Sequence, residues 1–210
     1  MPAKAKTQQE PQGEDRRGVA RRAKILGAAI EAFSDKGFDA ASTRDIARRA
    51  GIEQGLLTYH FPNKRALWCA AADAIFDDLA THIEDTLGSL ATSPPKERAR
   101  QGVREAVRYL AVKPELFRFL VDAGNRSDEM MQLLVDRHLQ PRFEFMLNEG
   151  VAKARDIDPS AAGHAFFALC GAASLIFAVA PACRRLTGID ATTQAAIDAH
   201  ADFLASLMVP

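Results

Sequence analysis

The segment from residue 43 to residue 64 contains side chains that can bind a nucleic acid in two ways. Gln54 has an amide that can form two hydrogen bonds with an adenine, and Leu56 can contact the methyl group of a thymine. Tyr59 and His60 can instead bond phosphate oxygens, which holds a protein on a duplex without reading its bases. The segment therefore predicts a DNA contact. The candidate residues are Thr43, Arg44, Gln54, Gly55, Leu56, Tyr59, His60 and Lys64.

Three short predicted helices position these side chains. An apolar stripe at helical spacing predicts the first helix, from Gly18 onward, and Gly37 followed by Phe38 is typical of its C-terminus. Ser42 and Asp45 have the spacing of a capping box and predict a second, short helix. The third helix, residues 52–60, follows after very few residues. Two helices joined by a tight turn containing glycine form a helix-turn-helix.

Longer helices are predicted for the rest of the chain. Asn63 can cap a long helix that fades near Ser93, and a second long helix covers about residues 95–112. A shorter helix starts at Pro114, and another covers residues 127–151, where Pro141 should introduce a kink. The last two helices cover residues 158–182 and 192–208. No stretch alternates as a strand would, so we expect an all-α fold of about nine helices.

Residues 23–67 resemble the DNA-binding domain of the TetR/AcrR family of bacterial transcriptional regulators. After residue 70 the similarity is limited to helix number, length and pattern. Two positions depart from the family pattern: Glu53 stands where Ser is usual, and Thr58 where Tyr is common. The resemblance is carried by Ile25-Leu26, Ala28-Ala29, Phe33, Gly37-Phe38, Asp45-Ile46-Ala47, Ala50-Gly51-Ile52, Gly55, Leu57, Tyr59-His60-Phe61, Lys64 and Leu67.

This resemblance implies how the chain is divided and with what it interacts. Residues 1–17 are expected to be a disordered arm whose Arg16 and Arg17 add DNA contacts together with Arg21 and Arg22. Residues 18–62 form the helix-turn-helix domain, and residues 63–210 form a helical domain for ligand binding and dimerisation. The implied partners are a palindromic double-stranded DNA operator, a second copy of the chain and a small apolar or amphipathic effector.

The effector should bind among aromatic, methionine and polar side chains of the larger domain. Phenylalanine and methionine side chains can line an adaptable apolar cavity, and a few polar groups orient a ligand inside it. For any single phenylalanine, ordinary core packing is the alternative. The candidate effector contacts are Phe117, Asn125, Met131, His138, Phe143 and Phe167.

The segment 160–183 is long, apolar and free of Lys, Arg, Asp and Glu, so by length it could span a bilayer. It is rich in Ala and Gly and contains His164 and Pro181, whereas large aliphatic side chains drive membrane insertion. We therefore expect no membrane partner, and a helix that packs on its own domain and on a second copy. Two alternatives stay open: a membrane-attached sensor through residues 160–182, and a DNA-binding protein that responds to no ligand.

The charge of the chain is distributed unevenly. Its 27 Lys and Arg balance 27 Asp and Glu, which alone would disfavour a nucleic-acid partner. Residues 1–68, however, contain 13 basic and 8 acidic side chains, a net charge of +5, and the remainder carries −5. Unless this is a chance fluctuation, a basic first third indicates contact with an anionic partner.

Catalytic and metal-binding patterns are missing from the sequence. The five His residues are scattered, and there is no HExxH, GxSxG, phosphate loop or paired Cys/His spacing. We expect no enzyme, no cofactor and no metal. The three Cys show no CxxC spacing and no even framework, which is typical of reduced thiols in a cytoplasmic protein.

Overall fold

The computed structural model describes residues 12–126 and 128–210, with side chains from residue 18 onward. This part of the chain is helical and contains no strand, as predicted. The α-helices are α1 (Gln12–Ala40), α2 (Thr43–Arg49), α3 (Gln54–His60), α4 (Lys64–Ser89), α5 (Pro95–Val112), α6 (Glu115–Gly124), α7 (Glu129–Leu134), α8 (Gln140–Asn148), α9 (Val151–Arg155), α10 (Ala162–Ala178), α11 (Ala180–Thr187) and α12 (Gln194–Met208).

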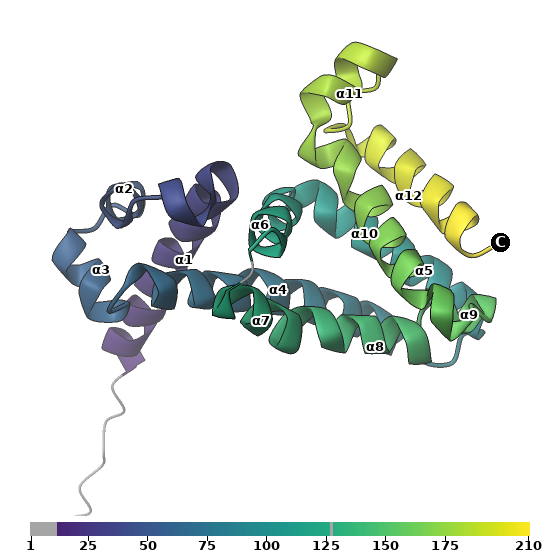
Figure 1. The fold of residues 1–210 in the computed structure, drawn as a ribbon, viewed down its shortest axis with the longest axis horizontal. Helices are drawn as coiled ribbons and strands as arrows, with labels where there is room; N and C mark the ends of the chain where they lie inside the picture. Colours follow the sequence, from purple (N-terminus) through teal and green to yellow (C-terminus); the bar gives the residue numbers. More distant parts are fainter. Residues whose placement is uncertain (1–11, 127) are drawn as a thin grey trace, which may run out of the picture.

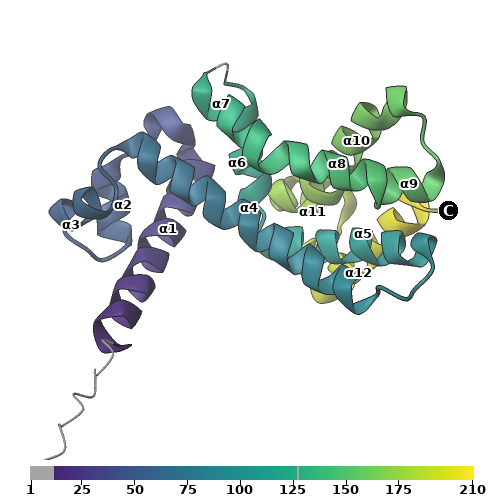
Figure 2. The ribbon, with the colours of Figure 1, turned by 90° about the horizontal axis from the view of Figure 1, so that it is seen from below.

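Helices α1, α2 and α3 gather at one end of the molecule, which we call the head (Figure 1). The helices from α4 onward form the rest of the molecule, which we call the body, and α4 runs from the head along it. In the body, α5 and α12 lie beside one another. The view turned by 90° shows the first turns of α1 projecting away from the head (Figure 2). This helix begins at Gln12, six residues before the expected start. Residues 1–11 of the expected arm lie outside the described residues.

The described residues form more helical segments than the nine expected, because two predicted helices are interrupted. Pro141 has no N–H to donate in the turn that precedes α8, and a π-helical turn, Val135–Leu139, separates α7 from α8 there. Helix α8 ends at Asn148, and a short helix that was not predicted, α9, begins at Val151 after Gly150. Pro181 similarly divides the predicted helix 158–182 into α10 and α11.

Two predicted helix termini have different outcomes. Asn63 caps α4 as expected, because its Oδ1 accepts a hydrogen bond from the Ala66 N–H at 2.8 Å. The capping box at Ser42 and Asp45 is wrong, since Ser42 makes no side-chain capping bond at α2. The Asp45 carboxylate bonds instead to Lys36, Arg48 and Arg49. Three cations therefore outcompete the backbone N–H groups for this carboxylate.

Aromatic side chains fill the junction between the head and the body. The buried Trp68 of α4 stacks on Phe119 of α6, with ring centroids 5.0 Å apart. Phe33 of α1 meets Phe119 edge-on at 6.4 Å, and Phe38 meets Trp68 edge-on at 6.5 Å. Burying several aromatic rings at one place stabilises it strongly. This cluster therefore fixes the end of α1 against the body.

Candidate nucleic-acid interface

A tight turn joins α2 to α3 in the order of a helix-turn-helix. Gly51 lies between them with a φ of 66°, a conformation that glycine adopts without strain, and the Ile52 N–H donates to the Ala47 carbonyl at 3.0 Å. Ile46 of α2 and Leu57 of α3 are 0% and 2% exposed and anchor the two helices in one core. The opposite face of α3 is left to solvent.

The solvent face of α3 presents groups that can bind DNA. Gln54 and Gly55 are exposed at its first turn, and a Cβ added to Gly55 would meet nothing within 4 Å, so the backbone can approach a partner there. The Tyr59 ring is 82% exposed, and its neighbour His60 packs edge-on against it at 5.4 Å. Leu56 and His60 are half-buried. The first turn of α3 can thus reach base edges of a DNA duplex, while Tyr59 can reach the phosphates of its backbone.

A pocket of about 380 Å³ lies between the N-terminal ends of α2 and α4 and the side of α3. Thr43, Thr58 and Lys64 contribute to its walls. Thr58 is one of the two residues that depart from the family pattern. Its hydroxyl donates to the Gln54 carbonyl of the same helix at 3.1 Å. Backbone N–H groups and hydroxyls at helix N-termini suit a phosphate oxygen.

The cations around this pocket differ in how far they are already engaged. Lys64 Nζ donates to the Asp39 carbonyl at 3.1 Å and lies 4.7 Å from the centre of the Phe38 ring. Arg44 is exposed and has no ion pair with any described residue. Arg48 hydrogen-bonds to Asp45 and, together with Lys36, lowers the pKa of that carboxyl from 3.8 to about 2. Of these three cations, Arg44 is therefore the one most open to an added anion.

Residues of the body hold the kink near the C-terminal end of α1. Gly37 has a φ of 74°, and the next N–H, that of Phe38, donates to the Asp122 carboxylate at 3.0 Å. Arg126 stacks on the Phe38 ring at 4.9 Å and pairs with Asp39 at 3.1 Å. Phe38 thus contacts a cation at the start of α4 and another just after α6. Sequence reasoning missed this contact, which we call the Phe38 latch, because its partners are more than 80 residues apart.

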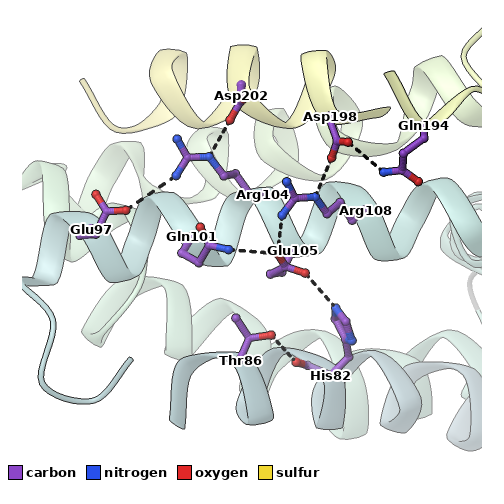
Figure 3. Close-up of polar contacts among 10 residues, drawn as sticks. All are labelled: His82, Thr86, Glu97, Gln101, Arg104, Glu105, Arg108, Gln194, Asp198 and Asp202. Carbon is purple, nitrogen blue, oxygen red and sulfur yellow. Dashed lines mark hydrogen bonds and ion pairs between the residues drawn. The ribbon is translucent and has the colours of Figure 1, made fainter. Parts of the chain in front are cut away.

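A polar network joins α4, α5 and α12 in the body (Figure 3). Arg108 of α5 bonds to Asp198 of α12 at 2.9 Å and to Glu105 at 2.6 Å. Glu105 in turn lies 3.7 Å from His82 of α4. A second pair, Arg104 with Asp202, joins α5 to α12 at 2.7 Å. The network therefore connects α4, through Glu105 and Arg108 of α5, to the side chains that contact α12.

The six candidate effector residues lie in different environments. His138 is 2% exposed, and its Nε2 lies 3.0 Å from the Asp73 carboxylate. Asn125 is exposed at the end of α6, where its amide bonds to a backbone carbonyl. Phe167 is 69% exposed, whereas its neighbour Phe166 is buried and meets Phe143 edge-on at 5.5 Å. The remaining residues of the set, Phe117, Met131 and Phe143, are half-buried.

These residues do not line either hollow described here. One hollow is the pocket between α2, α3 and α4. The other, of about 430 Å³, is an apolar depression on α10 and α11 next to Cys183, one of three free cysteines. Leu175, Val179 and Leu186 line it, and further large apolar side chains of α10 and α12 also face solvent. We call this surface the C-terminal apolar face; it comprises Phe167, Leu175, Val179, Leu186, Phe203 and Leu207.

The stretch Pro159–Ala178 is long and apolar enough to cross a membrane, and only 22% of its most apolar 18-residue window is buried. One such helix is weak evidence for a membrane, because the test uses length and composition alone. Its exposed apolar residues belong to the C-terminal apolar face.

Comparison with known proteins adds an independent observation. Residues 25–71 match the model of a family described as bacterial regulatory proteins, tetR family. Over 135 residues, the chain is 39% identical to the class D tetracycline repressor protein of Escherichia coli, covering 62% of this chain and 58% of that protein. Over 125 residues it is 29% identical to the transcriptional activator FasR of Mycolicibacterium smegmatis, covering 57% and 56%. The chain spans about half the length of the curated relatives it matches.

Solved structures resemble the fold over more of the chain. The fatty acid degradation regulator FadR from Bacillus halodurans superposes with a TM-score of 0.67 at 18% identity, covering 87% of this chain and 97% of that chain. At this identity the likeness concerns the fold. The arrangement of a helix-turn-helix head on a larger helical body is therefore shared with that regulator.

Proposed function

Because the chain belongs to the tetR family of bacterial regulatory proteins, we propose that it is a homodimeric transcription regulator that binds a palindromic DNA operator. The observation that carries the proposal is the solvent face of α3, where Gln54 and Gly55 precede the exposed Tyr59 above a core anchored by Leu57. The relatives named above are transcription regulators rather than enzymes. In this proposal the protein represses its operator and acts in the cytoplasm.

Each residue of the interface has a distinct part in the proposal. Gln54 reads a base edge in the major groove, with Leu56 beside it, and Gly55 lets the backbone come close. Tyr59 and His60 bond phosphates. Thr43, Arg44 and Lys64 surround a further phosphate near the pocket, for which Lys64 must leave, or share, its bond to the Asp39 carbonyl.

Selection of bound sequences from random duplexes tests this assignment. For Gln54→Ala we expect an altered sequence preference, because the amide that reads a base is lost. Tyr59→Phe should weaken binding to all sequences alike, because a hydrogen bond to a phosphate carries no sequence information. Gln140→Ala, on the exposed side of α8, is the matched control and should leave both properties unchanged. An unchanged preference for Gln54→Ala would refute the base-reading role.

The C-terminal apolar face supports dimerisation. Phe203 and Leu207 of α12 are 62% and 56% exposed, and Leu186 of α11 is 87% exposed. Apolar surface gathered in this way on adjoining helices is typical of an interface between protein chains. The face also accounts for the apolar character of residues 160–182 without a bilayer. Two heads held by such a dimer would meet half-sites about 34–36 Å apart.

The effector is proposed to be small and apolar or amphipathic, and to bind in the body near the half-buried aromatic residues. Binding can release DNA only if the effector prefers the arrangement of the heads that does not fit the operator. A thermal-shift screen followed by operator release would identify it. If no compound stabilises the protein, the chain is a DNA-binding protein that responds to no ligand. Recovery of the untagged protein in the membrane fraction would favour the membrane-attached sensor.

A further inference from the structure

A half-buried arginine ties the π-helical turn of the body to α4. This turn, Val135–Leu139, lies beside α4, and Arg142 follows it on α8 (Figure 1). The two terminal nitrogens of Arg142 donate to the His138 carbonyl of the turn and to the Phe76 carbonyl of α4. The guanidinium also lies 5.6 Å from the centre of the Phe76 ring. Turns of the π-helical type are frequent at functional sites.

The positive charge of Arg142 has no counter-ion. Among the side chains that the structure describes, no Asp or Glu forms an ion pair with its guanidinium. Burial lowers the pKa of Arg142 below its ordinary value, and the attraction of Asp77 and Glu84 does not make up for it. A charge held partly out of water without a partner costs free energy. An added anion at this place would therefore be stabilised.

The hydrogen bonds left unmade in the body call for an acceptor. The Nε–H of Arg142 is buried and has no partner. Of the buried side-chain atoms without a hydrogen-bond partner in the described residues, none is an oxygen. The nearby Asp73 is engaged by Arg137 and His138, whereas the Asp77 side chain is 71% exposed to water. Because buried donors are normally satisfied, the group that Arg142 lacks is an oxygen acceptor from outside the chain.

Apolar side chains surround this guanidinium. Met146, one turn after Arg142 on the same side of α8, is buried. Leu139 and Phe143 are partly buried and pack on the core from the same stretch of chain. Phe143 is already among the candidate effector contacts. A ligand whose charged group lies at Arg142 thus finds apolar surface for the rest of its length.

We propose that Arg142 binds the carboxylate of a small amphipathic acid through its Nε–H, while the apolar part of the acid lies on Leu139 and Phe143. The inference rests on the proposed function and names the chemical class of its effector. A carboxylate supplies the missing acceptor and the missing negative charge together. Hydrogen bonds between a guanidinium and a carboxylate are among the strong ones in proteins, because both partners are charged.

Probes with one alkyl chain and different head groups test this class. Calorimetric titration of the full chain with octanoate, octanol and octyltrimethylammonium gives a Kd for each, and we expect octanoate to bind most tightly. Arg142→Gln should weaken octanoate binding by about 10- to 150-fold, the worth of a charged hydrogen bond, and leave octanol binding unchanged. Arg142→Lys keeps the charge and should retain part of the preference for octanoate.

Arg98→Gln is the matched control. Arg98 lies on α5, is also half-buried with an unpartnered Nε, and forms no ion pair with any described residue. This variant should bind octanoate as the wild type does. Equal losses in Arg142→Gln and Arg98→Gln would refute the inference, as would equal binding of octanoate and octanol by the wild type or binding of neither. Tighter binding of octyltrimethylammonium would assign the place to cations and overturn it.

These titrations contain no DNA, so they decide the inference separately from the proposed function. Absence of specific operator binding by the wild type would refute the proposed function and leave the carboxylate site standing. Specific operator binding by a protein that shows no Arg142-dependent preference for octanoate would do the reverse.

Discussion

Replacing Gly37 by alanine tests the Phe38 latch. Gly37 has φ 74° and ψ 171°, a conformation that is essentially restricted to glycine, so a side chain there costs about 1–3 kcal/mol. The new Cβ would also collide with Asp122 Oδ1. Because that atom ends a flexible side chain, the carboxylate can move away, but it then loses its bond to the Phe38 N–H.

The expected cost combines these two effects. A hydrogen bond to a charged group contributes about 1.5–3 kcal/mol. Together with the backbone strain, Gly37→Ala should lower the free energy of unfolding by about 2.5–6 kcal/mol. In an Asp122→Ala background the collision and the bond are already gone, so the same change should cost only about 1–3 kcal/mol. The two substitutions are therefore expected to be non-additive.

Urea unfolding followed by tryptophan fluorescence measures the stabilities that this double-mutant cycle of Gly37→Ala and Asp122→Ala requires. Trp68 is the one tryptophan of the chain, is fully buried, and lies against the Phe38 ring. Gly27→Ala is the matched control, because Gly27 also lies on α1, where an added Cβ would meet nothing within 4 Å. That change should be neutral or stabilise by up to about 1 kcal/mol. Equal stabilities of Gly37→Ala and wild type, or full additivity with Asp122→Ala, would refute the reasoning.

Three further outcomes are expected. Glu53→Gln should tighten binding to every DNA sequence, because it removes an exposed anion beside the α3 face; fluorescence anisotropy that shows no gain would place Glu53 away from phosphate. Phe203→Glu should convert the proposed dimer to monomers in sedimentation, since it places a charge in the C-terminal apolar face, and persistence of dimers would exclude that face as the interface. Burial lowers the pKa of His138 below its ordinary value of 6.5, more than its bond to Asp73 raises it. The unfolded chain then takes up the proton first, so stability should be fully present above about pH 6.5 and fall below it. In His138→Gln this part of the pH dependence of urea unfolding should vanish, and an identical loss in both proteins would contradict it.

Local sequence patterns predicted the head well. The stripe through Ile25 and Phe33, the turn at Gly51 and the Asn63 cap each depend on residues close together in the chain. The capping box failed because Lys36, on another helix, competes for the Asp45 carboxylate. Whether a local cap forms depends on tertiary neighbours that a spacing pattern does not reveal.

The body was harder to predict for a related reason. Helical periodicity identifies an apolar stripe, but it could not choose between the adjacent Phe166 and Phe167, of which only the first is buried. The latch between Phe38 and Arg126 joins residues far apart in the chain and leaves no periodic signal. Gly37 was the one residue in the sequence that pointed to this contact, because a glycine at the end of a helix marks an unusual backbone conformation.

The π-helical turn has a consequence for insertions and deletions. The Gln140 N–H donates to the Val135 carbonyl five residues earlier, so this turn holds one residue more than an α-helical turn would. The wide turn absorbs this residue locally, so deleting one residue there would restore the ordinary repeat without rotating the helix that follows. The buried Met146 would then stay in the core. A one-residue deletion is therefore best tolerated at this turn, whereas the same deletion inside α8 would rotate everything after it by about 100°.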